Sequence, residues 1–195
     1  MTSERERTHV ALLRGVNVGA HNRIAMADLR ATAASLGWQD VATYVQSGNV
    51  VFTSAEQDAG ELARALEETI AEHVDVRCGV VVLTREELQQ VAAANPYPHE
   101  TDPKHLHVVF HSRDPGPDTA ATLAVAVERA QELGGRDEAT LVGRHLYLRT
   151  PDGLGRSRLA SELTRRPAAD APVGTARNWA TVTNLLALLE GPPPG

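Results

Sequence analysis

Short apolar runs and helical stripes alternate along the first half of the chain. Val10–Leu13 is an apolar run that stops at a glycine-rich loop, a pattern typical of a buried strand. Apolar residues at helical spacing follow and stop at Gly37, which favours a helix that ends there. Val41–Val45 and Val50–Thr53 are β-branched runs that flank turn-forming residues, so they predict a hairpin.

The remainder of the first half predicts two more helices with a strand between them. Asp58 with Glu61 forms a capping-box pattern ahead of the second helical stripe, and Thr84 with Glu87 forms another ahead of the third. Between these helices, Val76–Leu83 is an apolar run that predicts a fourth strand.

The second half repeats this order of elements. Its hairpin begins at residue 137 and that of the first half at residue 41, an offset of 96 residues. The elements predicted there are strands at Leu106–Phe110 and Pro172–Ala176, a helix at Asp118–Leu133, a hairpin across Gly143–His145, a short helix with Leu159 and Leu163, and a closing helix from Val182 to Leu189.

Each half therefore has the order β-α-β-β-α-β followed by one extra helix. This is the ferredoxin-like plan, in which an antiparallel sheet carries two helices on one face. We predict an α+β protein with two such units in tandem, at residues 1–95 and 96–190, and a disordered tail at 191–195. The alternative is one larger α+β domain with accidental periodicity.

The composition argues against general nucleic-acid binding. The formal net charge is −6, Lys104 is the only lysine, and 4% of the residues are aromatic, so the positive surface and the platform for stacking bases are both small. RNA-recognition modules share the ferredoxin-like plan but stack bases on aromatic residues of the first and third strands, where this chain offers only Phe52. Nucleic acid is an unfavoured partner that the composition does not exclude.

The expected compartment is the cytoplasm. Met1–Arg7 is charged and lacks the apolar segment of a signal peptide, and no apolar run reaches the length of a membrane span. Cys78 is the only cysteine, which rules out an internal disulfide. Its place in a predicted strand favours a buried and inert thiol.

Three histidines fall on one face of the strand that opens the second half: His105, His107 and His111. His-x-His is a metal-binding pattern, but a solvated outer face of the sheet explains the same alternation, and no acidic residue is interleaved on that face. We therefore predict no metal site, and no pattern in the chain indicates a cofactor.

Polar and glycine-rich loops converge at one end of the first predicted sheet. In the ferredoxin-like order the first two strands run parallel, so the loop after the first strand and the turn of the hairpin share a sheet end. Glycines there let backbone N–H groups approach a ligand, and the first helix points its N-terminus to the same end, which favours an anion. Solvated turns are the alternative. The candidate ligand-binding residues are Arg14, Asn17, Asn22, Arg23, Gln46, Ser47 and Asn49.

A second candidate anion site lies in the second half. The loop that enters its second helix carries Arg156 and Ser157, and the last strand ends at Arg177 and Asn178. We expect Arg177 to be a surface residue whose guanidinium group shares one oxyanion with that of Arg156, beside two helix N-termini. The alternative is that Ser157 and Asn178 only cap helices and both arginines are solvated.

The blocks of sequence that carry these loops are Ala11–Gly19, Met26–Arg30 and Tyr44–Phe52, with Asn95-Pro96, Gly155–Leu159 and Thr175–Trp179 further along. Together they resemble the bacterial family called domain of unknown function 1697, over nearly the whole chain. The resemblance implies a two-part α+β fold of ferredoxin-like character. It implies no activity.

The functional hypothesis is a cytoplasmic protein that binds an anionic small molecule, a nucleotide or phosphorylated metabolite, through these loops. No catalytic motif stands out, which favours binding over catalysis. One alternative is an enzyme for a phosphorylated substrate, with His21 or Asp152 in acid–base roles. Another is a module for single-stranded nucleic acid or protein partners. The sequence predicts no membrane partner and leaves the oligomeric state open.

Overall fold

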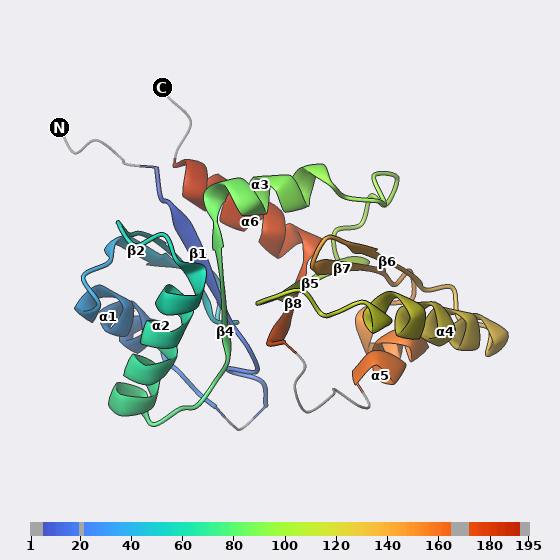
Figure 1. The fold of residues 1–195 in the computed structure, drawn as a ribbon, viewed down its shortest axis with the longest axis horizontal. Helices are drawn as coiled ribbons and strands as arrows, with labels where there is room; N and C mark the ends of the chain where they lie inside the picture. The colour runs from blue at the N-terminus through green and yellow to red at the C-terminus, as the bar shows by residue number, and fades with distance from the viewer. Residues whose placement is uncertain (1–5, 20–21, 165–171, 192–195) are drawn as a thin grey trace. The chain divides into compact units, whose positions relative to one another are not determined.

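Two four-stranded antiparallel sheets, each with two helices of its own, make up the protein (Figure 1). The computed structural model describes residues 6–19, 22–164 and 172–191. The chain divides into unit 1, Met1–Ala92 together with Val182–Gly195, and unit 2, Ala93–Thr181. In this division the last helix begins in unit 2 and continues in unit 1. Residues 192–195 of the expected tail lie outside the described residues.

Unit 1 has the strand order β2-β3-β1-β4, and each neighbouring pair is antiparallel. Its elements are β1 (His9–Leu13), α1 (Met26–Ser35), β2 (Gln39–Thr43), β3 (Asn49–Thr53), α2 (Ala59–Val74), β4 (Val80–Thr84) and α3 (Arg85–Ala93). The central strand β1 pairs Ala11 with Val50 of β3 and with Val82 of β4. This is the ferredoxin-like order that the sequence predicts.

Side chains at two helix starts of unit 1 satisfy the first backbone amides. At α2, the Asp58 carboxylate accepts from the N–H groups of Gly60 at 2.8 Å and Glu61 at 3.0 Å. At α3, the Thr84 hydroxyl accepts from the Glu87 N–H at 3.1 Å while the Glu87 carboxylate accepts from the Thr84 N–H at 3.0 Å. The predicted caps at both helices are confirmed, the second as a reciprocal capping box.

The fourth strand is shorter than the predicted Val76–Leu83. β1 ends at Leu13, and the last backbone bond along this edge joins the Arg14 N–H to the Gly79 carbonyl at 2.8 Å. β1 therefore gives the residues ahead of Gly79 no strand to pair with, and Cys78 lies in the loop before β4, half-buried against the core. Burial there raises the pKa of the Cys78 thiol to about 11.

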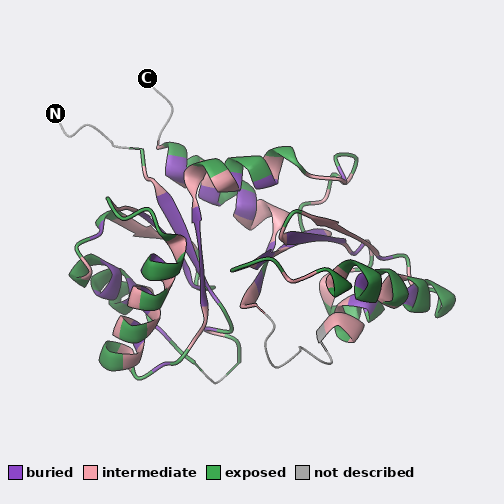
Figure 2. Ribbon diagram, in the orientation of Figure 1, coloured by how far each residue is buried: buried purple, intermediate pink, exposed green. Residues whose placement is uncertain are grey.

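Strands β3, β1 and β4 of unit 1 are buried on both faces (Figure 2). One face packs against α1 and α2, where Phe52 and Leu66 belong to a continuous apolar core. On the opposite face, alternate residues such as Val10 and Leu12 are fully buried as well. Burial on both faces explains why the strands read as unbroken apolar runs rather than as an apolar-polar alternation.

α3 and the C-terminal part of α6 (Trp179–Glu190) are attached to the start of β1. The Arg85 N–H at the start of α3 bonds to the Thr8 carbonyl at 2.8 Å, and the Arg7 N–H bonds to the Leu189 carbonyl at 3.0 Å. The Arg7 guanidinium also donates to the Leu188 carbonyl at 2.6 Å. The backbone N–H and the side chain of Arg7 thus each satisfy a carbonyl group that the last turn of the helix leaves unpaired.

Unit 2 repeats the plan with the strand order β6-β7-β5-β8, again antiparallel throughout. Its elements are β5 (Leu106–His111), α4 (Asp118–Glu132), β6 (Glu138–Val142), β7 (His145–Arg149), a 3₁₀ turn η1 (Leu154–Arg156), α5 (Arg158–Thr164) and β8 (Gly174–Asn178). β3 begins at Asn49 and β7 at His145, which is the 96-residue offset seen in the sequence. The tandem α+β fold is confirmed.

The central strands β5 and β7 of unit 2 are also buried on both faces. Val109 packs with Leu146 on the side that carries α4 and α5, and Val108 and Phe110 are fully buried on the opposite side. Because strand side chains alternate, His107 shares the helix-covered face with Val109. His107 is buried, and burial lowers its pKa. The expected solvated outer face is therefore wrong, because neither face of the strand is open to water at this residue.

Candidate functional site

Three loops meet at one end of the unit 1 sheet. The Leu13 N–H bonds to the Gly48 carbonyl at 2.8 Å, which joins the loop after β1 to the turn between β2 and β3. The bond from Arg14 to Gly79 adds the segment before β4. We call residues 14–19, 22–25, 44–48 and 75–79 the loop end of unit 1. The expectation that the first loop and the hairpin turn share a sheet end is confirmed.

Asn17 holds the first loop in shape. Its side-chain amide donates to the Ile24 carbonyl at 3.0 Å and to the Gln46 carbonyl at 2.8 Å, and its amide oxygen accepts from the Ile24 N–H at 2.9 Å. Its backbone has a φ of 55°, in the left-handed region that asparagine tolerates better than most residues. The structure thus uses this predicted ligand-binding residue to clamp the loop to the hairpin turn.

Gly48 packs the hairpin turn tightly against the same loop. Its φ is +71°, and a Cβ at this position would lie 2.4 Å from Cγ2 of Val16 and 2.8 Å from Cβ of Leu13. Val16 and Ile24 are buried, so both ends of the loop are anchored in the core, while Val18, Gly19, Asn22 and Arg23 between them are exposed. The loop end therefore has a fixed base.

The remaining predicted amide and hydroxyl residues lie around this base. Asn49 is buried and its amide donates to the Tyr44 carbonyl and to the Ser47 hydroxyl, both at 2.9 Å. Asn22, with a φ of 51°, donates weakly to the Gly15 carbonyl at 3.4 Å. Gln46 is exposed, and its backbone carbonyl receives the Asn17 amide. Asn49 and Ser47 thus shape the turn.

Positive side chains face solvent at the loop end. Arg14 and Arg23 are exposed, and among the described residues neither guanidinium group has a hydrogen-bond or ion-pair partner. α1 starts at this end, and its N-cap residue, Ala25, supplies no side-chain bond to the first amides. Unpaired cations and uncapped amides at one sheet end are the groups that an anion needs.

Two further arginines of this region were not among the predicted binding residues. Arg77 is exposed and lies two residues before Gly79, and Arg30 of α1 donates to the Thr43 hydroxyl at 2.7 Å. The signal for Arg77 was available, because a strand antiparallel to the first must begin at the end where the first one finishes. The Arg30 contact depends on how α1 packs beside β2, which the sequence does not specify.

In unit 2, the two predicted polar residues act as helix caps. Ser157 is 3% exposed, and its hydroxyl donates to the Asp137 carboxylate at 2.9 Å while accepting from the Ala160 N–H at 2.8 Å. The Asn178 side chain accepts from the Thr181 N–H at 2.9 Å at the start of α6. Both residues satisfy amides of helix first turns, which is the alternative reading of the sequence.

Arg177 is a buried residue, so the expectation of a surface arginine is wrong. It is 7% exposed, and it sits opposite the fully buried Val108 in the β5–β8 ladder. Its guanidinium group donates to the Thr175 hydroxyl at 2.7 Å and to the Ala176 carbonyl at 2.8 Å, and burial lowers its pKa to about 10. Arg156 is exposed on η1. An oxyanion shared by Arg156 and Arg177 stays a prediction.

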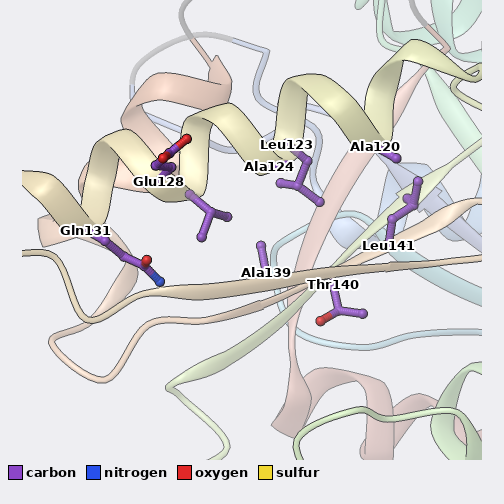
Figure 3. A pocket seen from close by; sticks show the side chains of 9 residues that line it. Ala120, Leu123, Ala124, Glu128, Gln131, Ala139, Thr140 and Leu141 are labelled. Atoms are coloured by element: carbon purple, nitrogen blue, oxygen red, sulfur yellow. The ribbon is translucent and has the colours of Figure 1, made fainter.

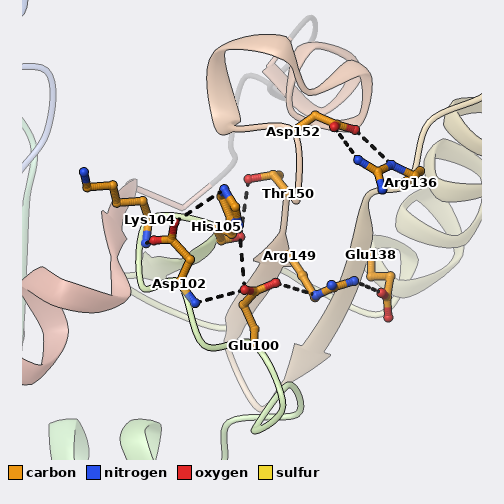
Figure 4. A network of polar contacts seen from close by, with 9 residues as sticks. All are labelled: Glu100, Asp102, Lys104, His105, Arg136, Glu138, Arg149, Thr150 and Asp152. Atoms are coloured by element: carbon orange, nitrogen blue, oxygen red, sulfur yellow. Dashed lines mark hydrogen bonds and ion pairs between the residues drawn. The ribbon is translucent and has the colours of Figure 1, made fainter.

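The other charges near the end of β7 are paired with each other (Figure 4). Arg149 bonds to Glu100 at 2.8 Å and to Glu138 at 2.6 Å, and His105 lies 3.7 Å from Glu100. The Asp102 backbone N–H and Arg149 both donate to the Glu100 carboxylate, which holds its pKa below the usual range. Carboxylates in this network neutralise the charge of Arg149, so the region is poorly suited to binding an anion.

Fold and loops define a two-unit ferredoxin-like α+β protein with basic loops at one end of its first sheet. Residues 7–147 match the family described as Protein of unknown function (DUF1697), so the chain belongs to this family. Its structure is similar to that of a conserved bacterial protein from Streptococcus pneumoniae, with a TM-score of 0.71 and 22% identity, covering 94% of this chain and 98% of that one. This likeness shows a shared fold. No curated protein sequence matches the chain.

Two kinds of feature, membrane-spanning helices and metal-binding groups of side chains, are absent from the described residues. No helix there combines the length and apolar character needed to cross a membrane. In the same residues, no three His, Cys, Asp or Glu side chains are grouped so that they could hold a metal ion.

Proposed function

We propose that the protein binds an anionic small molecule, of the class of nucleotides and phosphorylated metabolites, at the loop end of unit 1. The observation that supports this most is that Arg14 and Arg23 are exposed there without a partner among the described residues. Each guanidinium group offers a planar set of donors that matches phosphate oxygens.

Several arginines elsewhere in the chain are paired with carboxylates, unlike Arg14 and Arg23. Arg85 is paired with Glu6 and Glu86, and Arg136 is paired with Asp152. Arg14 and Arg23 lie at one sheet end without a carboxylate partner among the described residues, and two such cations close together in the fold favour an anionic ligand.

The rigid base of the loop end also favours binding. Asn17 and Gly48 fix the loop against the hairpin turn before any ligand arrives. A preformed loop loses little conformational entropy when a ligand binds, so two or three charge-assisted hydrogen bonds suffice for a measurable affinity.

A thermal-shift experiment tests the proposal. The probes are ATP, glucose 6-phosphate and inorganic phosphate, with adenosine as an uncharged control. A ligand at about 100 times its Kd raises the free energy of unfolding by about 2.7 kcal/mol, which is a shift of several degrees for a protein of this size. We expect at least one phosphorylated probe to stabilise the protein and adenosine to have no effect.

The double variant Arg14→Ala/Arg23→Ala then locates the site. It should lose the shift, because each charge-assisted hydrogen bond contributes about 1.5–3 kcal/mol. Arg64→Ala is the matched control, since Arg64 is an exposed arginine of α2 that pairs with Glu61 and Glu68, away from the loop end. A shift that survives in the double variant, or disappears in Arg64→Ala, would show that the loop end is not the binding site.

The enzyme alternative has less support. Asp152 is paired with Arg136, and hydrogen bonds from that guanidinium group hold the pKa of the carboxyl below its usual range. A carboxylate with a lowered pKa is a weak general base at neutral pH. His21, the other candidate for an acid–base role, lies outside the described residues.

A further inference from the structure

An open groove lies between α4 and β6 in unit 2 (Figure 3). It has a volume of about 480 Å³. The residues that line it are Ala120, Leu123, Ala124, Val127, Glu128 and Gln131 of α4 with Ala139, Thr140 and Leu141 of β6. Most of this lining is aliphatic, and three of its members are alanines that leave room for larger side chains.

The strand beside the groove is an edge strand with an open backbone. β6 pairs with β7 along one side, and no backbone group of the described residues bonds to its other side. Thr140 lines the groove although its side chain points away from α4 in Figure 3, and its hydroxyl lies 2.9 Å from that of Tyr97. The part of Thr140 that faces the groove is therefore its backbone.

The corresponding edge in unit 1 is protected. The ladder of β2 has a bulge between Gln39 and Ala42, Asp40 in that bulge has a φ of 52°, and its carbonyl accepts from the Arg7 guanidinium at 2.6 Å. Bulges and charged side chains are the usual means by which edge strands avoid pairing with other chains. β6 has a straight register without a bulge, and its one charged residue, Glu138, is ion-paired with Arg149.

α4 also differs from its counterpart α1. α1 buries Leu29, Thr32 and Ala33, whereas the longer α4 buries Leu123 and Ala130, and Val125 on its surface is 64% exposed. An unshielded strand edge next to a helix, with an aliphatic groove between them, is the geometry in which proteins bind an extended peptide as an added strand.

We propose that this groove binds an extended peptide segment of a partner protein, which pairs with β6 and places large apolar side chains at alternate positions between β6 and α4. A lysine or arginine of the peptide lies beside Glu128. Glu128 lines the groove, is exposed and has no ion-pair partner among the described residues. This inference does not depend on the anion site.

Charge complementarity favours a foreign peptide over a second copy of this chain. The sequence of β6 is Glu-Ala-Thr-Leu-Val, which carries an acidic residue and no basic one. A second β6 in the groove would therefore bring no cation to Glu128. A basic and apolar peptide supplies both the hydrogen bonds and the opposite charge.

Selection from a phage-displayed library of random ten-residue peptides, with the full chain as bait, tests the proposal. The enriched peptides are expected to alternate large apolar and polar residues and to contain at least one lysine or arginine. A synthetic copy of the most enriched peptide is then titrated by fluorescence anisotropy, together with a version methylated on alternate backbone amides. The methylated peptide should bind at least tenfold more weakly, because it keeps the side chains and loses the strand donors.

Three variants locate the binding site. Ala124→Leu fills the groove and Glu128→Lys reverses its charge, and each should weaken peptide binding about tenfold or more. Glu132→Lys is the matched control: it makes the same charge change one turn further along α4, outside the groove lining, and should change the Kd less than twofold. Circular dichroism checks that each variant keeps its helices.

Hydrogen exchange gives a second measurement on the unmodified chain. Saturation with the synthetic peptide should slow exchange at the amides of Ala139–Leu141, whereas a peptide bound elsewhere leaves them unchanged. The proposal would be overturned if the enriched peptides lacked the alternation, or if the Ala124→Leu and Glu128→Lys variants bound the peptide as tightly as the unmodified chain. A dimer that pairs β6 with β6, seen in sedimentation and hydrogen-exchange experiments, would also overturn it.

Discussion

Ser157→Ala removes one oxygen atom that makes two buried contacts, and we expect it to lower the free energy of unfolding by about 3 kcal/mol. The hydroxyl caps α5 through the Ala160 N–H at 2.8 Å, and loss of a helix cap costs about 1 kcal/mol. It also donates at 2.9 Å to Asp137, which is 5% exposed. A buried carboxylate that loses a donor is destabilised by about 1.5–3 kcal/mol.

Urea denaturation followed by circular dichroism measures this loss. The midpoint should fall while the slope of the transition stays unchanged, because the surface exposed on unfolding is the same. Ser161→Ala is the matched control, since Ser161 lies one turn further along α5 and its hydroxyl donates to the Ser157 carbonyl at 3.0 Å. It removes a hydroxyl that caps no helix start and should cost at most about 1 kcal/mol.

A double-mutant cycle with Asp137→Ala separates the two contributions. If the hydroxyl and the carboxylate stabilise each other, the double variant should lose about 1–2 kcal/mol less than the two single changes predict. The structural role would be refuted if the losses of the two single variants added up to that of the double variant. It would also be refuted if Ser157→Ala unfolded at the same urea midpoint as the unmodified protein. A variant with normal stability and weakened binding of a phosphorylated probe would instead return Ser157 to the ligand-binding residues.

Three further predictions concern other buried groups. Burial lowers the pKa of His145 from 6.5 to about 4, so between these pH values the unfolded chain binds a proton at this residue and the folded chain does not. The free energy of unfolding should therefore fall by about 3 kcal/mol as the pH drops from 6.5 to 4, measured by urea denaturation. His145→Leu should remove this part of the pH dependence. The thiol of Cys78 has a pKa of about 11 in the folded chain, against 9.0 for an exposed thiol, so less of it is thiolate at pH 8. Native Cys78 should therefore react with a disulfide reagent about a hundredfold more slowly than in denaturant. Rapid labelling of the native protein would contradict its burial. Gly48→Ala, which forces a Cβ to within 2.4 Å of Val16 at a φ of +71°, should cost about 2 kcal/mol or more in urea titrations, and an unchanged midpoint would show that the turn relaxes freely.

The sequence determined the features that depend on near neighbours. The capping box of Thr84 and Glu87 forms as predicted because its two hydrogen bonds join residues three apart. The repeat of strand and helix patterns fixed the order of elements, and only a few right-handed, short connections can join such an order. Those two constraints were enough to predict two ferredoxin-like sheets and the meeting of the first loop with the hairpin turn.

The sequence was less informative about which polar residues remain available to a ligand. Asn17 and Ser157 both have the residue type and loop position of a binding residue, yet each is engaged by groups of its own unit: Asn17 with Ile24 and Gln46, Ser157 with Asp137. These partners are separated by 7 to 29 residues along the chain. Composition and spacing do not specify such contacts, because they arise when the loops pack.

Only the tertiary structure decided which faces are covered and which edges stay open. The sequence predicts Arg177 and His107 to be surface residues, but both are buried in the structure, and their burial follows from packing that local periodicity does not encode. β2 and β6 occupy equivalent edges, and only packing and the bulge near Asp40 distinguish them. The apolar pattern of a strand predicts which of its faces is buried. The space beside that strand depends instead on how closely a helix packs against it.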